Sequence, residues 1–353
     1  MATVAFHTLG CKVNSYESEA MLEIFKKRGY ETIDFESPAD VYVINTCTVT
    51  NTGDSKSRQM IRKAHRTNPE AVICVVGCYS QVASEEITGI EGVSVVLGTQ
   101  HRASIVDFVE EYKSTHKQIV KIENVMKVSR FEDLSIHAFE NKTRAFLKIQ
   151  DGCNNFCTYC IIPYARGGVR SRPKEDVLKQ AQELVDRGFV EIVLTGIHTA
   201  GYGVDLDNYS FYDLLVDLTT KIKGLKRLRI SSIEMSQVSD EIIELIGKSP
   251  IIVDHLHIPI QSGTDSILRR MARHYNTAEF EKKYFELKEA LPGISITTDV
   301  IVGFPGETEE DFVDTYNWIK KLHFNQLHVF PYSRRKGTPA DRMPNQVPGD
   351  IKK

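Results

Sequence analysis

The chain has 353 residues, of which 41% are hydrophobic and 26% are charged, and its formal net charge is −3. This is the composition of an ordinary globular protein with enough apolar residues for two hydrophobic cores. The small negative charge excludes a globally basic nucleic-acid-binding surface, so any positive patch has to be local. The seven cysteines are an odd number and residues 1–30 lack an apolar signal segment, so we expect reduced thiols and a cytoplasmic protein.

Residues 1–132 alternate apolar runs with amphipathic segments, which predicts an N-terminal domain with an open parallel α/β sheet. Strands are expected at 4–9, 41–44, 71–76 and 93–97. Helices are expected at 15–28, at 56–67, from Ser84 and at 102–113. Gly29 is expected to act as the C-cap of the first helix, and Asn14 with Glu17 resembles a capping box at its start.

Three cysteines of this domain, Cys11, Cys47 and Cys78, each follow a predicted strand. Ligands of open α/β sheets bind outside the carboxyl ends of the strands, so we expect the three thiols to converge although 36 and 31 residues separate them. Spacing this wide leaves scattered core cysteines as the alternative. Cys74 lies inside an apolar run and is expected to be a small core residue.

Residues 116–143 form a polar connection with one short apolar piece at 119–122, and we place the domain boundary at 132/133. In residues 133–353 the alternation resumes. Strands are expected at 146–150, 192–194, 228–232, 255–260, 294–302 and 327–331, and helices at 175–186, 212–222, 241–246, 279–291 and 309–322. Right-handed crossovers would wrap these units into a six-strand partial (β/α) barrel, whose chemistry is expected at the carboxyl ends of the strands.

Cys153, Cys157 and Cys160 follow the first of these strands with the spacing Cys-x₃-Cys-x₂-Cys. Three thiolates can hold a four-iron cluster and leave one iron without a protein ligand, so that this iron can bind a reactant. A structural zinc site needs a second pair of ligands, which does not follow here, and bacterial ferredoxins have a different spacing. The motif therefore predicts an enzyme.

The spacing resembles that of the radical S-adenosylmethionine superfamily, in which the open iron binds S-adenosylmethionine and an electron from the cluster cleaves it to a 5′-deoxyadenosyl radical. The segments 8–19, 45–50 and 76–81 around the upstream cysteines resemble the amino-terminal signature of the methylthiotransferase family. The segments 195–197, 259–263 and 302–308 also match that family in order, so the resemblance covers essentially the whole chain.

This resemblance implies a second four-iron cluster at Cys11, Cys47 and Cys78, which carries sulfur for the insertion of a methylthio group at C2 of an adenosine in tRNA. The segments 10–14 and 57–59 resemble the branch that acts on threonylcarbamoyl-adenosine next to the anticodon. Isopentenyl-adenosine and a ribosomal-protein aspartate are the alternatives within the family. An iron–sulfur redox or RNA-binding protein without turnover is the alternative from another class.

The implied partners are the tRNA anticodon stem-loop and an electron donor such as flavodoxin or ferredoxin, with no membrane partner. The oligomeric state stays open. Members of the family commonly add a small carboxyl-terminal RNA-binding β-barrel, and we expect it to be absent from this chain, which stops at Lys353.

Residues at the ends of the later strands are the candidates for holding S-adenosylmethionine, although each is equally compatible with a buried polar residue that its neighbours satisfy. They are Thr195, Gly196, Ile197, Ser232, Glu234, Gln261, Ser262 and Asp299. Candidate RNA contacts are the arginines that recur on one helix face, Arg58, Arg62 and Arg66. Arg166, Arg170 and Arg172 follow the cluster motif and are candidates for contact with RNA phosphates or with the substrate carboxylate.

Overall fold

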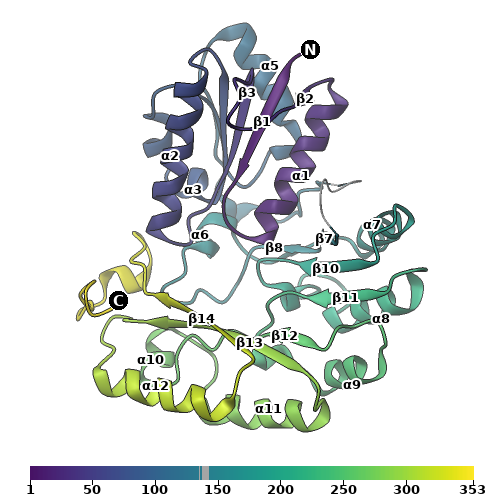
Figure 1. Cartoon of the computed structure of the whole chain (residues 1–353), viewed down its shortest axis with the longest axis vertical. Coiled ribbons are helices and arrows are strands. Elements are labelled where there is room, and N and C mark those ends of the chain that lie inside the picture. Colours follow the sequence, from purple (N-terminus) through teal and green to yellow (C-terminus); the bar gives the residue numbers. More distant parts are fainter. Residues whose placement is uncertain (135, 137–142) are drawn as a thin grey trace.

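The structure, a computed structural model, describes residues 1–134, 136 and 143–353 and has two α/β units, one above the other in Figure 1. The N-terminal unit contains a parallel sheet with the strand order β2-β1-β3-β4-β5-β6. Its strands are β1 (Thr3–Thr8), β2 (Glu31–Thr32), β3 (Val41–Thr46), β4 (Val72–Gly77), β5 (Val93–Leu97) and β6 (Ile119–Lys121). Every residue of β3, β4 and β5 is buried, so both faces of the sheet must be covered.

Helices cover both faces of this sheet (Figure 1). They are α1 (Lys12–Lys27), α2 (Asn51–Thr67), α3 (Cys78–Val82), α4 (Ser84–Thr88) and α5 (Ile105–Thr115). Phe25 of α1 and Val109 of α5 belong to one apolar cluster, and Ile61 of α2 belongs to the cluster on the opposite face. Cys74 is fully buried in the first cluster, which agrees with its prediction as a core residue.

The second unit is the predicted partial barrel of six parallel strands. They are β7 (Ala145–Lys148), β10 (Glu191–Thr195), β11 (Arg227–Ile230), β12 (His255–His257), β13 (Ser295–Val302) and β14 (Gln326–Pro331). Three-stranded sheets β7-β10-β11 and β12-β13-β14 meet where Leu228 bridges Ile252 and Ser232 bridges His257. A short antiparallel pair, β8 (Gln150–Asp151) and β9 (Arg170–Ser171), follows the first strand.

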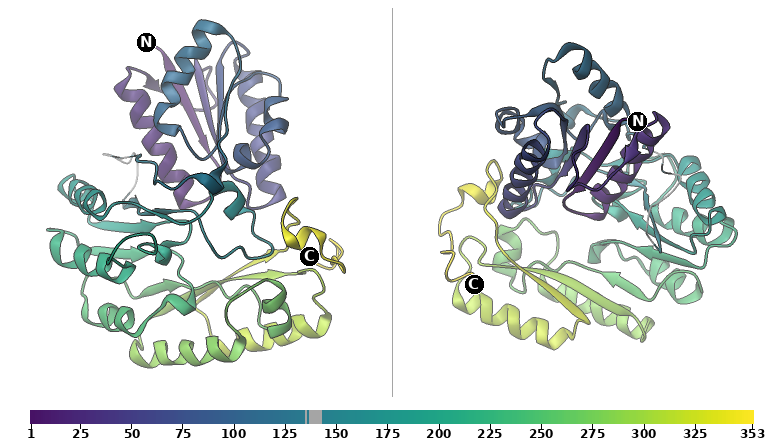
Figure 2. Two further views of the ribbon diagram at one scale, coloured as in Figure 1. Left: turned by 180° about the vertical axis from the view of Figure 1, so that it is seen from behind. Right: turned by 45° about the horizontal axis from the view of Figure 1, so that its top comes forward.

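Most helices of the second unit line the outer side of the curved sheet (Figures 1 and 2). Five of them agree with the predicted helices: α7 (Lys174–Asp186), α8 (Phe211–Lys221), α9 (Asp240–Lys248), α11 (Thr277–Ala290) and α12 (Glu309–Leu322). Two short helices were not predicted: α6 (Ile162–Arg166) and α10 (Asp265–Arg270). Capping boxes at Ser210, Asn276 and Thr308 fix the starts of α8, α11 and α12.

Two local predictions in the N-terminal unit were wrong. Helix α1 begins at Lys12 with Cys11 as its N-cap, and Asn14 and Glu17 do not form a capping box there. Both side chains instead contact residues of the second unit, as described below. The apolar piece at 119–122 is not part of a linker, because three of its residues form β6 at the edge of the sheet.

The carboxyl ends of the N-terminal strands point toward the barrel (Figure 1). Tyr16 of α1 packs into the barrel core, and its hydroxyl donates to the Leu134 carbonyl at 2.6 Å. The predicted boundary at 132/133 falls between β6 and β7, in the polar connection, of which residues 135 and 137–142 lie outside the described residues. Among the described residues, no helix has the length and apolar character needed to cross a membrane.

Candidate active site

The first set of thiols lies in the loop between β8 and α6. Cys157 is buried, and Cys153 and Cys160 are half-buried. The Cys153 amide donates to the Gly167 carbonyl at 3.0 Å, and the Cys160 amide donates to the Cys157 carbonyl at 2.9 Å, so the loop folds back on itself. Burial raises the pKa of Cys153 to about 11 and that of Cys160 to about 12, and the charge of Cys157 acts in the same direction. Such a donor set fits a cationic iron–sulfur cluster, because metal binding deprotonates its thiol ligands.

Arg273 lies against this set of thiols, a contact that the sequence did not predict. Its Nη1 donates to Sγ of Cys157 at 3.5 Å and to Oε1 of Glu234 at 3.0 Å. Asn155 donates to the same carboxylate oxygen at 3.1 Å. Glu234 therefore lies beside the thiols, as its strand-end position predicted, but its carboxylate is already paired. No spacing pattern identifies Arg273, because 116 residues separate it from Cys157.

The other predicted contacts to S-adenosylmethionine differ in their accessibility. Gln261 and Asp299 line a cavity together with Cys160, and Ser232 is exposed. Two of these residues, Thr195 and Ser262, have buried hydroxyls with contacts inside the protein, and their contact with S-adenosylmethionine stays a prediction. Thr195 is buried and donates to the Val193 carbonyl at 3.2 Å. Ser262 is fully buried, and its Oγ accepts from the Thr264 amide at 3.5 Å.

Gly196 has a packing reason to be glycine. A Cβ at this position would come within 2.9 Å of the Gln150 side chain, so the loop after β10 can pack against Gln150 only without a side chain there. Ile197 follows in the same loop and is half-buried. Contact of either residue with S-adenosylmethionine stays a prediction.

The second set of thiols lies at the carboxyl ends of β1, β3 and β4, which are neighbours in the sheet. Cys11 precedes α1, Cys47 follows β3, and Cys78 begins α3. Burial raises the pKa of Cys78 to about 12, and the charges of Cys11 and Cys47 act in the same direction. Gly10 has a φ of +106°, and a Cβ there would come within 3.1 Å of the Cys47 sulfur, so glycine allows the first two loops to meet.

Arg166 in α6 connects this second set to the barrel. Its Nε donates to Sγ of Cys78 at 3.2 Å, and its Nη2 donates to Oδ1 of Asn14 at 2.9 Å. Asn14 in turn donates to the carbonyls of Leu9 and Thr46, at 2.7 and 3.0 Å, so it ties the loop of Cys11 to the loop of Cys47. Arg166 of the barrel therefore contacts the thiol of Cys78 and also the Asn14 side chain, which joins the loops of Cys11 and Cys47.

A buried network of charges surrounds Arg166. Glu17 is fully buried and pairs with Arg102 at 2.6 Å, Arg166 at 2.6 Å and Lys148 at 2.7 Å. Burial alone would raise the pKa of Glu17, but these three cations outweigh it and hold the pKa well below its usual value. Asp151 pairs with Lys148 at 2.6 Å and Arg166 at 3.2 Å. Glu17 and Arg102 come from the N-terminal unit and the other three residues from the barrel, so the network joins the two units.

The structure contradicts the prediction that Arg166, Arg170 and Arg172 grip a substrate carboxylate. All three side chains are buried, with exposed fractions of 0, 1 and 2%. Arg170 donates to the Gly168 carbonyl at 2.9 Å, and Arg172 pairs with Asp133 at 3.3 Å and donates to Gln180. These arginines do lie close to the cluster motif, but their side chains face the junction of the two units and not an open pocket.

The arginines of α2 are only partly free. Arg62 and Arg66 are exposed, and Arg58 is held by the Tyr79 hydroxyl at 2.7 Å and by Glu86 at 3.0 Å. Together with His65 and two glutamates they line a groove of about 450 Å³. The groove thus offers two exposed guanidinium groups, and Arg58 serves mainly to fix the helix to its neighbours.

The segment after β14 crosses from the barrel to the N-terminal unit and contacts both thiol loops. Buried Arg335 donates to the Thr48 hydroxyl and to Oδ2 of Asp54, each at 2.6 Å, in the segment that follows Cys47. The Ala340 amide donates to the Thr158 carbonyl at 2.9 Å, within the first thiol loop. We call residues 333–340 the strap. Since it bonds to both loops, it fixes the distance between them.

A cavity of about 270 Å³ lies between the two thiol loops. Val49 and Thr50, in the segment that follows Cys47, line it from the N-terminal unit. The barrel contributes Cys160 with its neighbours, two strand-end polar residues and the last strand: Tyr159, Cys160, Ile161, Ile162, Gln261, Asp299, Ile301, Phe330, Pro331, Tyr332 and Ser333. Its walls are mainly apolar and aromatic, with a few polar groups, as is typical of pockets for a planar organic ligand.

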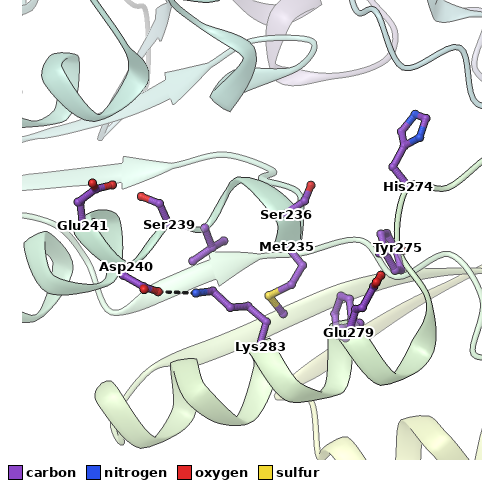
Figure 3. Close-up of a pocket in the computed structure, with 11 residues that line it drawn as sticks. Met235, Ser236, Ser239, Asp240, Glu241, His274, Tyr275, Glu279 and Lys283 are labelled. Atoms are coloured by element: carbon purple, nitrogen blue, oxygen red, sulfur yellow. Dashed lines mark hydrogen bonds and ion pairs between the residues drawn. The ribbon is translucent and has the colours of Figure 1, made fainter.

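A second cavity, of about 510 Å³, lies between α11 and the residues that precede and begin α9 (Figure 3). Its lining includes Tyr275, Glu279 and the ion pair of Asp240 with Lys283, at 2.6 Å, but no cysteine. Within the described part of the chain, no group of three or more His, Cys, Asp or Glu side chains is arranged to hold a single metal ion.

Comparison with known proteins identifies the class. The family model for the radical SAM superfamily matches residues 147–319, and that for the uncharacterized protein family UPF0004 matches residues 3–98. The solved structure of the radical S-adenosylmethionine methyltransferase TsrM from Kitasatospora setae, with cobalamin and a [4Fe-4S] cluster bound, matches with a TM-score of 0.69 over 96% of this chain and 77% of that chain. At 15% identity this likeness shows the fold alone. The barrel is that of a radical S-adenosylmethionine enzyme, with S-adenosylmethionine and [4Fe-4S] chemistry.

Relatives in sequence narrow this class to one family. The threonylcarbamoyladenosine tRNA methylthiotransferase MtaB of Bacillus subtilis (strain 168) is 59% identical over 100% of this chain and 78% of the relative. The tRNA-2-methylthio-N(6)-dimethylallyladenosine synthase of Finegoldia magna is 36% identical over 99% of this chain and 77% of that relative. The chain therefore belongs to the radical S-adenosylmethionine methylthiotransferase family, within which it is more similar to the first of these two relatives, and it is an enzyme.

The strap generates a first prediction. Arg335→Met leaves the buried carboxylate of Asp54 without its cation, and breaking one partner of a buried pair costs about 3–5 kcal/mol. We expect a loss of that size in the free energy of unfolding, measured with denaturant. Adding Asp54→Asn should recover part of the loss. Arg334→Ala, which removes an exposed partner of Asp341, should cost less than about 1 kcal/mol. Equal stabilities of the Arg335 and Arg334 variants would contradict the role of the strap.

Proposed function

We propose that this enzyme inserts a methylthio group at C2 of N6-threonylcarbamoyladenosine next to the anticodon of tRNA, with the use of two [4Fe-4S] clusters. The observation that carries the proposal is that Cys160 of the first thiol loop and Val49 and Thr50, in the segment after Cys47, line one cavity of about 270 Å³. Transfer of sulfur to an unactivated carbon needs a hydrogen-abstracting site and a sulfur site that face the same base. The 59% identical relative is named for this substrate.

Each of the two proposed clusters would be held by one set of three thiols. Cys153, Cys157 and Cys160 would hold the radical cluster, and Cys11, Cys47 and Cys78 would hold a second cluster, which we call the auxiliary cluster. When bound, the two groups supply the electron that cleaves S-adenosylmethionine and the sulfur that is transferred. An external donor such as flavodoxin or ferredoxin would provide that electron, and we propose that the enzyme works in the cytoplasm.

The residues around the cavity would bind and orient the target base. Tyr159, Phe330 and Tyr332 offer aromatic faces, and Gln261 and Asp299 offer hydrogen-bond partners for the edge of a base or for the ribose of S-adenosylmethionine. His257 pairs with Asp299 at 3.1 Å and fixes the direction of its carboxylate. An anticodon-loop base can leave the stack at modest cost and enter such a pocket, so a loop nucleotide is a suitable substrate.

The first prediction for this function concerns iron. The fully reconstituted enzyme should contain about eight iron atoms, as two four-iron clusters require. Substitution of Cys153, Cys157 and Cys160 by Ala should leave about four, because the auxiliary set is built from other loops. Cys74→Ser is the matched control and should keep about eight, since its side chain lies in an apolar core. A total of about four iron atoms in the unsubstituted enzyme would refute the two-cluster proposal.

The second prediction concerns the RNA surface. Arg62→Glu combined with Arg66→Glu should weaken tRNA binding and lower the slope of log affinity against log salt by about one per lost phosphate contact. The matched control is Lys248→Glu with Lys282→Glu, which reverses two exposed charges on α9 and α11, at the opposite end of the molecule (Figure 1). Unchanged affinity and slope in the Arg62 and Arg66 variant would show that the groove on α2 does not bind RNA.

The third prediction concerns the modified base. Given matched anticodon stem-loops, the enzyme should modify the one with threonylcarbamoyl-adenosine at least roughly ten-fold faster than the one with isopentenyl-adenosine. A site built for a carboxylate-bearing group leaves polar groups unpaired when an isopentenyl group enters, at about 1–3 kcal/mol each. Mass analysis of the nucleosides measures both products. Comparable rates, or labelling of a ribosomal-protein aspartate, would reject this substrate, and absence of S-adenosylmethionine cleavage would favour a binding protein without turnover.

A further inference from the structure

Arg166 has an unusual set of contacts for an arginine in the junction of two units. Its Nη1 donates to Oε1 of Glu17 at 2.6 Å and to Asp151 at 3.2 Å, and its Nη2 donates to Asn14 at 2.9 Å and to Oε2 of Glu17 at 3.0 Å. Its Nε donates to Sγ of Cys78 at 3.2 Å. With these partners all five N–H groups of the guanidinium are used, and the side chain is fully buried. The plane of the guanidinium is therefore fixed, and its Nε–H points at the sulfur.

The carboxylates alone do not explain this arrangement. Glu17 already pairs with Arg102 and Lys148, and Asp151 already pairs with Lys148. Among the described residues that pair in the network, four cations, Arg102, Lys148, Arg166 and Arg170, face three carboxylates, Glu17, Glu132 and Asp151. A metal-bound, deprotonated cysteine at Cys78 would add a negative charge beside these cations, and the Nε–H of Arg166 already points at its sulfur.

We propose that Arg166 is a positioning residue that sets the reduction potential of the auxiliary cluster through its hydrogen bond to Cys78. The proposal rests on the assignment of that cluster to Cys11, Cys47 and Cys78 in the proposed function. A charge-assisted hydrogen bond withdraws electron density from a ligand sulfur, which favours the reduced cluster and raises the potential.

The position of Arg166 in the chain adds a second consequence. Arg166 ends α6, which begins two residues after Cys160, and α6 lies between the N-terminal sheet and the barrel (Figure 1). The auxiliary thiols come from the N-terminal unit, but their hydrogen-bond donor comes from the loop of the radical cluster. The auxiliary cluster therefore reaches its working potential only when the two units are docked in this geometry.

The test uses full-length protein in which Cys153, Cys157 and Cys160 are Ala, so that the auxiliary cluster is the one observed. In this background Arg166→Lys should keep about four iron atoms, because the ammonium remains with the two carboxylates. Its midpoint potential, from a redox titration followed by electron paramagnetic resonance, should shift to a more negative value. Arg102→Lys is the matched control: it alters a buried arginine that pairs with Glu17 but donates to no sulfur, and should shift the potential less.

The outcomes separate the two proposals. Absence of iron in the parent background would overturn the auxiliary cluster itself. Iron content of about four with an unchanged potential in Arg166→Lys, or an equal shift in Arg102→Lys, would overturn the role of Arg166 while leaving the cluster in place. If Arg166→Lys loses iron, parent protein labelled with ¹⁵N-arginine decides the question: a nitrogen hyperfine coupling at the reduced cluster supports the hydrogen bond, and its absence overturns it.

Discussion

The pairing of Glu17 with cations from both units is the interaction on which the rest of the structure depends. Glu17 lies on α1, three residues beyond Asn14, and has no contact with water. A buried carboxylate is tolerated only with close partners, and here Arg102 comes from its own unit while Lys148 and Arg166 come from the barrel. Any displacement of the barrel relative to the sheet would leave buried charges unpaired. The network therefore selects one docking geometry, even though ion pairs of this kind add little net stability.

That single geometry brings the segment after Cys47 and the loop of Cys160 to the same cavity. The carboxyl ends of β1, β3 and β4 bring three cysteines together in one unit, and one loop after β8 brings three together in the other. Neither set is placed relative to the other by local structure. The charge network joins the two units at Glu17, and the strap joins them a second time, where Arg335 donates to Asp54. Both contacts consist of buried polar groups, whose geometry is far more specific than apolar packing.

Each thiol set also has one arginine that donates to a cysteine sulfur: Arg273 to Cys157 at 3.5 Å and Arg166 to Cys78 at 3.2 Å. The guanidinium suits this task because its charge is permanent and its donors are held in a plane. In both cases a carboxylate fixes the arginine from the other side, Glu234 in the first case and Glu17 in the second. The same arrangement thus occurs at both sites, although the two arginines lie in unrelated parts of the fold.

The sequence by itself determined the fold class, the longer helices and most strands of both units, and the two groups of three cysteines, while short elements such as α6 and α10 were not predicted. These features depend on local patterns, since apolar runs of strand length and the spacing of Cys153, Cys157 and Cys160 are read within short windows. The sequence also predicted that Cys11, Cys47 and Cys78 converge, because each follows a strand and the carboxyl ends of neighbouring parallel strands lie at the same edge of the sheet. Only the tertiary structure decided the partners of the charged residues. Arg166 contacts Cys78 across 88 residues and Arg335 contacts Asp54 across 281, and no sequence window reports such contacts. For that reason Arg166, Arg170 and Arg172 could be recognised as a basic group near the site, while their burial at the junction of the two units could be seen only in three dimensions.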